Sequence, residues 1–228
     1  IAIVSGGGSG FGSGIVRKFA KEGAKVIVAD IQIENAKKVA HAAGGVAVEV
    51  DVSNSLSFKN LVSTTLEKFG KIDIMVNNAG ITHTPKKMED ISEEEFDRIF
   101  SVNSKSVFLC AKYLVPLMIS NGGGNILNIA STAGISPRPN LSWYNATKGW
   151  MISATKSMAI ELAPKKIRVN ALAPVAGETP LLKSFMGGDT PEKREKFLST
   201  IPIGRFSTPD DMGNAACFLC SEEASMIT

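Results

Sequence analysis

The stretch Ile1-Ala2-Ile3-Val4, followed by Ser5-Gly6-Gly7-Gly8-Ser9-Gly10-Phe11-Gly12, decides the fold of this chain. The first four residues predict a buried strand, and the pattern over residues 12–21 predicts a helix. Glycines between a strand and a helix let the backbone approach a phosphate, whose charge is favoured by the free N–H groups of the helix start. Their spacing is G-x-x-x-G-x-G, which differs from G-x-G-x-x-G. The turn predicts either a phosphate site or only a flexible corner.

The rest of the chain repeats this alternation of strand and helix. Short β-branched runs predict strands, and amphipathic runs predict helices, the third of them capped by Ser55. The expected strands are residues 1–4, 25–29, 46–50, 72–77, 125–130 and 167–173, and the expected helices are residues 12–21, 33–43, 55–69, 93–118 and 144–162. Strands that are apolar on both faces and alternate with helices predict an α/β fold. We expect a doubly wound parallel sheet flanked by helices on both faces, with its ligand beyond the carboxyl ends of the strands.

The composition is that of one globular domain spanning residues 1–228. Hydrophobic residues make up 44% of the chain, so a single core can form without disulfides or a metal. The 25 basic and 22 acidic residues are scattered along the sequence, which disfavours nucleic-acid binding. No apolar run approaches the roughly 18 residues of a membrane span, so we expect no membrane association.

The three cysteines, Cys110, Cys217 and Cys220, cannot all pair, which favours a reducing compartment and a cytoplasmic location. Cys217 and Cys220 have the C-x-x-C spacing of some zinc and redox sites. Their neighbours are apolar and the chain has only 2 His residues, so we expect these cysteines to pack in a helix core and no metal to bind.

Five polar residues are candidates for chemistry. Asp30 ends the second predicted strand, where it can accept hydrogen bonds from both ribose hydroxyls or simply cap the next helix. Tyr144 and Lys148 share one helix face, and the ammonium would lower a phenol pKa of about 10. Ser131 follows a strand and can emerge at the same edge. Asn103 is polar among apolar neighbours, and its alternative role is a helix bend or a core hydrogen bond.

Residues 175–206, which we call the lid segment, form a long connection rich in Gly, Pro and Thr, with a short helical stretch at residues 192–198. Long irregular connections often act as lids or binding loops. Its apolar side chains can close over a substrate, and Gly187-Gly188 would provide a pivot. The alternative is a surface segment that packs on its own domain or on a neighbouring subunit. The apolar side chains are Leu181, Leu182, Phe185 and Met186.

Together these motifs resemble the short-chain dehydrogenase/reductase family over nearly the whole chain. Ser5 to Gly12 matches the family's Thr-Gly-x-x-x-Gly-x-Gly with Ser for Thr, and Asn77 to Gly80 matches Asn-Asn-Ala-Gly. Within the family the chain looks most like 3-oxoacyl-acyl carrier protein reductase-like and glucose 1-dehydrogenase-like members. The resemblance implies a Rossmann-type, three-layer αβα fold.

The resemblance also implies hydride transfer between a nicotinamide cofactor and a secondary alcohol or ketone, such as a 3-oxoacyl thioester. It implies that Tyr144 is the general acid/base and that Lys148 lowers its pKa and holds the nicotinamide ribose. It further implies that Ser131 orients the substrate oxygen and that Asn103 holds a relay water. A homotetramer is implied, formed through the helices that carry Asn103 and Tyr144. The implied cofactor-binding residues are Gly6, Ser9, Gly10, Phe11, Gly12, Asp30, Ile31, Asp51, Val52, Asn78, Ala79, Gly80, Tyr144, Lys148, Pro174 and Thr179.

Asp30 predicts a preference for NAD over NADP. It is followed by Ile31 and not by Arg, so a 2′-phosphate would face an uncompensated carboxylate. The sequence leaves open whether Arg17, the nearest basic residue in the first helix, reaches that phosphate. Val175 follows Pro174 where the family commonly has Gly. The chain begins inside the first strand and stops at Thr228, so we expect both ends to be incomplete.

Two other functions are weighed against this one. A methyltransferase would share the glycine turn but leave Ser131, Tyr144 and Lys148 unexplained. A non-catalytic NAD-binding sensor or regulatory subunit often lacks the Tyr or the Lys, and this chain has both. The sequence does not specify the substrate. Trp143 fits two roles, which are lining the substrate pocket and packing against a helix or a neighbouring subunit. Candidate pocket residues are Thr132, Ala133, Gly134, Trp143, Leu181, Leu182 and Phe185.

Overall fold

Six parallel strands form one sheet in the order β3-β2-β1-β4-β5-β6 in the computed structural model, which describes all residues 1–228. The doubly wound prediction is confirmed, and each strand lies within about two residues of its expected range. The order reverses between β1 and β4, which is where sheets of this kind bind ligands. The strands are β1 (Ala2–Ser5), β2 (Val26–Asp30), β3 (Val46–Glu49), β4 (Ile74–Asn77), β5 (Gly124–Ile129) and β6 (Ile167–Leu172).

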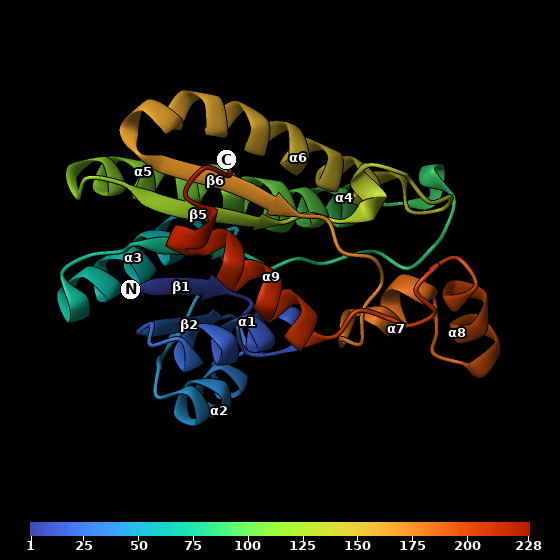
Figure 1. The fold of residues 1–228 in the computed structure, drawn as a ribbon. Coiled ribbons are helices and arrows are strands. Elements are labelled where there is room, and N and C mark those ends of the chain that lie inside the picture. Colours follow the sequence, from blue (N-terminus) through green and yellow to red (C-terminus); the bar gives the residue numbers. More distant parts are fainter.

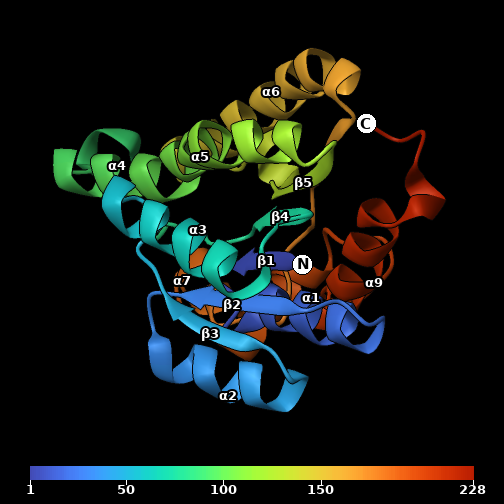
Figure 2. The same ribbon diagram turned by 90° about the vertical axis from the view of Figure 1, so that its left-hand side faces the viewer.

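Alternating strand side chains build two cores, one on each face of the sheet. Ile3 of β1 packs in the core under α3 and α5, whereas its neighbours Ala2 and Val4 pack in the core under α1, α2 and α9. Because both faces are covered, the strands read as continuous apolar runs. The two helical layers lie on opposite sides of the sheet (Figure 2). The helices of these layers are α1 (Gly10–Lys21), α2 (Ile33–Ala43), α3 (Ser55–Phe69), α4 (Glu93–Phe100), α5 (Ser106–Ser120), α6 (Ser142–Leu162) and α9 (Pro209–Cys220).

The start of α3 differs from the prediction. Asn54 is the N-cap, and its side chain accepts a hydrogen bond from the N–H of Ser57 at 2.9 Å. The predicted cap, Ser55, is the first helical residue, and its hydroxyl pairs with that of Tyr113 at 2.6 Å. Both residue types cap helices well, and the backbone geometry selects the earlier one.

The predicted helix over residues 93–118 runs from α4 into α5 but contains one π-helical turn, Ser101–Lys105. This turn carries Asn103, which is fully buried. The combined helix, Glu93–Ser120, is long and apolar enough to cross a membrane by length and composition alone. In the structure its side chains Leu114 and Met118 pack in the core under the sheet.

The C-x-x-C pair lies on α9 and packs as a helix core, as expected from its neighbours. Cys220 is buried in the cluster beside α1, and Cys217 packs against the same cluster. Burial raises the pKa of the Cys220 thiol to about 12, which favours the uncharged form.

The lid segment leaves the sheet beyond the carboxyl ends of the strands and carries α7 (Leu181–Met186) and α8 (Pro191–Leu198) (Figure 1). Gly187, with φ of 68°, is the left-handed C-cap of α7. Gly187-Gly188 therefore joins α7 to α8 inside the segment. Movement about this pair stays a prediction.

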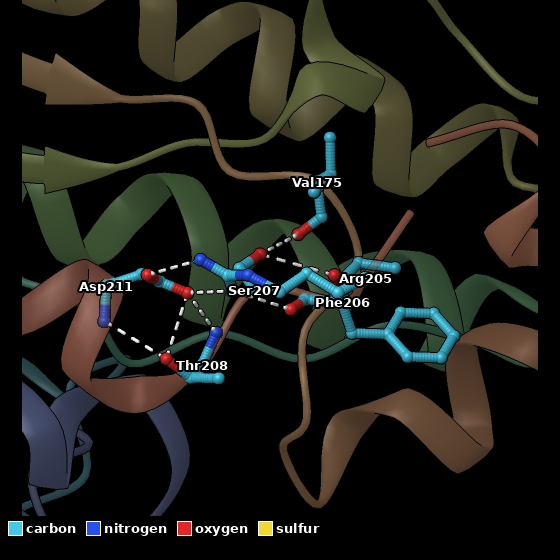
Figure 3. A network of polar contacts seen from close by, with 7 residues as sticks. Val175, Arg205, Phe206, Ser207, Thr208 and Asp211 are labelled. Atoms are coloured by element: carbon cyan, nitrogen blue, oxygen red, sulfur yellow. Dashed lines mark hydrogen bonds and ion pairs between the residues drawn. The ribbon is translucent and has the colours of Figure 1, made fainter. Parts of the chain in front are cut away.

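Hydrogen bonds join the start of the lid segment, at Ala176 and Glu178, to Ser207 directly after its end. We call this connection the neck (Figure 3). The N–H of Ser207 donates to the carbonyl oxygen of Ala176 at 3.1 Å, and the N–H of Glu178 donates to that of Ser207 at 2.8 Å. Arg205 binds both carboxylate oxygens of Asp211 on α9, at 2.5 and 2.9 Å. The segment is thus a closed loop attached to the domain through this neck.

Candidate active site

A cavity of about 580 Å³ lies at the carboxyl ends of the strands, between the sheet and the lid segment. The glycine turn and Asp30 form one part of its wall, and Ser131, Tyr144 and Phe185 form another. Its size is within the range of small-molecule and cofactor sites. The cavity therefore joins the two groups of residues that the sequence pointed to separately.

The glycine turn shapes its part of the wall by the absence of side chains. Gly6 and Gly10 have φ of 63° and 49°, in the left-handed region that favours glycine. A Cβ on Gly6 would lie 2.9 Å from the Cα of Ala79. The helix α1 starts here with no side-chain cap and no acidic residue in its first turn, so its N–H groups can receive an anion.

Gly12 lies where α1 packs against the glycine turn. It does not line the cavity, and a Cβ at this position would collide with the carbonyl oxygen of Gly6. The glycine lets the first turn of α1 pack directly onto the loop before it. A direct contact of Gly12 with a cofactor stays a prediction.

Ser5 and Asn78 tie the glycine turn to the end of β4. The Ser5 hydroxyl accepts from the N–H groups of Asn78 and Ala79, each at 3.1 Å, and donates to the carbonyl oxygen of Val76 at 3.2 Å. The Asn78 amide donates to the carbonyl oxygens of Ser5 at 2.8 Å and Gly6 at 3.1 Å. Asn78 lines the cavity, but its side chain is used to hold the turn.

Asp30 lies at the end of β2 in the cavity wall. Its carboxylate accepts from the N–H of Gly8 and the N–H of Gln32, both at 2.9 Å. It therefore orders the turn after β2, and its remaining lone pairs can still accept hydrogen bonds from hydroxyls. Arg17 does not line the cavity and instead donates to Asp210 of α9 at 3.1 Å. The other predicted cofactor residues in the wall are Ser9, Phe11, Ile31, Asp51, Val52, Ala79, Gly80, Pro174 and Thr179.

Tyr144 and Ser131 meet at the other part of the wall. Tyr144 is 5% exposed and makes an edge contact with Phe185, with ring centroids 5.5 Å apart. Ser131 follows β5, and its hydroxyl accepts from the N–H of Ala133 at 3.1 Å. Burial raises the pKa of the Tyr144 phenol, and a hydrogen bond with Ser131 opposes that rise.

Lys148 is buried one helical turn after Tyr144, and no carboxylate pairs with it. Its Nζ donates to the carbonyl oxygen of Ile129 at 2.7 Å and lies 5.9 Å from the centroid of the Tyr144 ring. Burial lowers the pKa of Lys148 to about 8. The expected fall in the Tyr144 pKa is not seen, because burial of the phenol raises this pKa and the Lys148 ammonium is directed at Ile129.

Asn103 stands behind the cavity wall and crosslinks three segments. Its Oδ1 accepts from the N–H of Ile81 at 2.9 Å, and its Nδ2 donates to the carbonyl oxygen of Ile81 at 2.9 Å and to the Thr147 hydroxyl at 3.1 Å. Both amide hydrogens are used, so only a lone pair of Oδ1 is left for a water. The core hydrogen-bond alternative is thus the one that the structure contains.

The candidate pocket residues divide into two sets. Thr132, Leu181, Leu182 and Phe185 line the cavity, whereas Ala133, Gly134 and Trp143 do not. Trp143 packs edge-on against Phe96 of α4, with centroids 5.5 Å apart, and its Nε1 donates to the carbonyl oxygen of Met88 at 3.1 Å. For Trp143, packing against a helix is the correct alternative.

Sequence reasoning missed Arg138, which lies in the loop between β5 and α6 and lines the cavity. Its guanidinium carbon lies 4.6 Å from the centroid of the Phe197 ring, and its Nη2 donates to the Thr200 hydroxyl at 3.1 Å. Both partners belong to the lid segment, so no local sequence signal could have placed this side chain at the site.

Comparisons with known proteins agree with this geometry. A family model described as enoyl-(acyl carrier protein) reductase matches residues 6–228. The 4-formylbenzenesulfonate dehydrogenase of Comamonas testosteroni is 45% identical over 100% of this chain and 93% of its own length. The 3-oxoacyl-[acyl-carrier-protein] reductase of Thermotoga maritima is 39% identical over 100% of this chain and 93% of its own length. The crystal structure of 3-ketoacyl-(acyl-carrier-protein) reductase from Brucella melitensis complexed with NADH has a TM-score of 0.94 at 52% identity, covering 100% of this chain and 93% of that one.

The chain belongs to the short-chain dehydrogenase/reductase family. It is an oxidoreductase acting on CH–OH groups, and the resemblance inferred from its motifs is confirmed. The named relatives are dehydrogenases and reductases, so the sensor alternative is not favoured.

Proposed function

We propose that this protein transfers hydride between NAD(H), in preference to NADP(H), and a secondary alcohol or ketone. The observation that carries the proposal is the single cavity that joins Gly6, Gly10 and Asp30 to Ser131 and Tyr144. A dinucleotide and a small substrate would then share one space at the carboxyl ends of the strands.

The residues present fit a nicotinamide dinucleotide. The turn at Gly6 and Gly10 has no side chains in the way of a pyrophosphate, and the uncapped start of α1 offers N–H donors to it. Asp30 keeps lone pairs for the ribose hydroxyls and would repel a 2′-phosphate. When bound, the cofactor supplies or accepts the hydride.

The chain's own residues manage the proton and orient the substrate. Tyr144 gives its hydroxyl proton to the substrate oxygen in reduction and takes it back in oxidation. Ser131, which lines the same cavity, orients the same oxygen. Lys148, with its pKa near 8, carries positive charge at neutral pH beside the phenol and can hold the ribose. Asn103 fixes the turn of α6 that carries Tyr144, and a relay water would use its Oδ1.

The wall beside Tyr144 suits a substrate with an apolar body, because Leu181, Leu182 and Phe185 line it. A 3-oxoacyl thioester fits this description and is the substrate class in the names of two similar proteins, those of Thermotoga maritima and Brucella melitensis. An aromatic substrate also fits, as in the name of the Comamonas relative.

A homotetramer in the cytoplasm is part of the proposal. Phe100, Phe108 and Trp150 are exposed on α4, α5 and α6, the helices through which the subunits would associate, and covering them would bury apolar surface. Sedimentation at four times the 24.2 kDa of one chain is the expected result. A monomer at micromolar concentration would contradict the tetramer.

The proposal is tested by replacing Tyr144 with Phe, which removes the transferable proton and keeps the ring. A panel of ketones, acetoacetyl thioesters, sugars and cyclic diols is first assayed with NAD(H) and NADP(H) by nicotinamide absorbance. With the best substrate, Tyr144→Phe should lower turnover by at least ~10²-fold, the usual contribution of general acid/base catalysis. Turnover close to that of the wild type would contradict the assignment.

A further inference from the structure

We infer that Arg138 recognises an anionic group on the substrate, so that this site prefers ketones and alcohols carrying a carboxylate, sulfonate or phosphate away from the reacting carbon. The inference rests on the proposed function, in which Tyr144 and Ser131 mark the reacting end of the cavity.

Arg138 is placed at a distance from the reacting end by an aromatic row. Phe185 lies 5.5 Å from Tyr144 and 5.9 Å from Phe197, measured between ring centroids. The Arg138 guanidinium stacks on Phe197 at 4.6 Å. Its backbone is fixed by Asn145, the residue after Tyr144, whose amide donates to the Arg138 carbonyl oxygen at 2.8 Å. Two aromatic rings, Phe185 and Phe197, therefore lie between the phenol and this cation in the row of contacts, and Phe185 and Arg138 both line the cavity.

The charge on Arg138 is not neutralised within the chain. Its only side-chain hydrogen bond goes to the neutral hydroxyl of Thr200, and it makes no ion pair. The lid-segment arginines differ, since Arg194 binds Glu178 and Asp189, and Arg205 binds Asp211. An unpaired, half-buried guanidinium keeps most of its donors for a ligand, and an anion is the partner that best offsets the cost of its burial.

The other charges in the cavity wall strengthen this reading. The acidic residues that line it are Asp30 and Asp51, which follow β2 and β3 at the proposed cofactor part. Around Tyr144 the lining residues are hydroxyl-bearing or apolar apart from Lys148, and a second arginine, Arg98, also lines the cavity. A substrate anion would thus meet Arg138 without a competing carboxylate of the protein.

The test compares two ketones of similar shape, 4-acetylbenzoate and 4′-methylacetophenone, each reduced with NADH. The wild type should reduce the anionic ketone with a kcat/KM roughly 10- to 100-fold higher, the range expected of a hydrogen-bonded charge pair. Arg138→Gln should abolish this preference by raising KM for 4-acetylbenzoate, with the neutral ketone changed by less than about 2-fold. Arg138→Lys should retain part of the preference.

Thr200→Val is the matched control, because it removes the hydrogen bond to the lid segment but leaves the charge. It should keep the preference for the anion. If Arg138→Gln slows both ketones equally, or if the wild type reduces both ketones with equal efficiency, Arg138 only fastens the lid segment and the inference is overturned.

A second measurement separates this inference from the proposed function. Calorimetric titration of the NADH-loaded Tyr144→Phe protein with 4-acetylbenzoate reports binding without turnover. Binding that is lost on adding Arg138→Gln supports the inference even if the wild type reduces neither ketone, a result that would count against the proposed function. Binding that is unchanged by Arg138→Gln overturns the inference alone.

Discussion

The Nζ of Lys148 donates a hydrogen bond to the backbone carbonyl oxygen of Ile129 at 2.7 Å, and both residues are buried. This contact joins α6 to the end of β5 and holds the ammonium near Tyr144 without a carboxylate counterion. A single neutral acceptor compensates poorly for loss of water around a charge, so the protonated lysine is costly to the fold.

Stability should therefore respond to pH through Lys148. Its pKa falls from 10.5 to about 8 on folding, so between these values the unfolded chain binds the proton that the folded chain has lost. The free energy of unfolding attributable to this group then rises with pH, by about 2 kcal/mol between pH 7.5 and 9.5. The measurement is the difference in urea unfolding free energy between the wild type and Lys148→Met at the two pH values.

The control is Lys156→Met, which removes an exposed lysine from the same helix. The difference in free energy of unfolding between the wild type and Lys156→Met should stay constant over the same pH range. A constant difference for Lys148→Met as well would show that Lys148 stays protonated in the folded protein.

Asp30 should set the choice between the two cofactors. The wild type should have a kcat/KM at least ~10²-fold higher with NADH than with NADPH, because repulsion of a 2′-phosphate costs several kcal/mol. Asp30→Ser should narrow this ratio by about tenfold or more. Asp30→Asn, which keeps an acceptor for the N–H of Gly8, should narrow it similarly if charge is the cause. Equal or better efficiency of the wild type with NADPH would refute the preference.

The lid segment should close over the substrate. Hydrogen exchange in α7 and α8 should slow when NAD and a substrate analogue bind together, because the apolar side chains of α7 would then exclude water. Phe185→Ala should raise KM for the substrate by roughly tenfold and change cofactor affinity little, since Phe185 contacts Tyr144. The control is Ile203→Ala, whose side chain is 76% exposed. If hydrogen exchange in α7 and α8 does not change in the ternary complex, the lid segment only packs against the domain.

Gly14 should be the glycine whose replacement costs most between α1 and α9. A Cβ there would collide with the carbonyl oxygen of Pro209 at the start of α9. Gly14→Ala should lower the free energy of unfolding by about 2 kcal/mol or more, measured by urea denaturation. Gly149→Ala is the matched helical control, because its Cβ would meet only the Gly134 oxygen at 3.6 Å, an ordinary contact. That variant should be neutral or more stable by up to about 1 kcal/mol. If both variants lost the same free energy of unfolding, the contact between Gly14 and Pro209 would not be the cause of the loss.

Much of the fold followed from local patterns, because periodicity reports which face of a strand or helix is buried. The bounds of α2 and α3 match their predicted ranges, and each strand lies close to its own. The finer features depended on contacts from elsewhere in the chain. Asn54 took the cap expected at Ser55, and the π turn at Asn103 accompanies hydrogen bonds to Ile81 and Thr147.

The features of the site also divide into those that follow from local sequence patterns and those that depend on contacts from elsewhere in the chain. Sequence patterns alone predict that the glycine turn, Ser131, Tyr144 and Lys148 meet at one edge, because parallel strands end together and residues four apart share a helix face. The environment of these groups depends on tertiary packing, since burial governs the pKa of Tyr144 and Lys148. Tertiary packing alone also brought Arg138 to Phe197 and Thr200, because side chains this far apart in sequence meet only when the lid segment packs over the sheet edge.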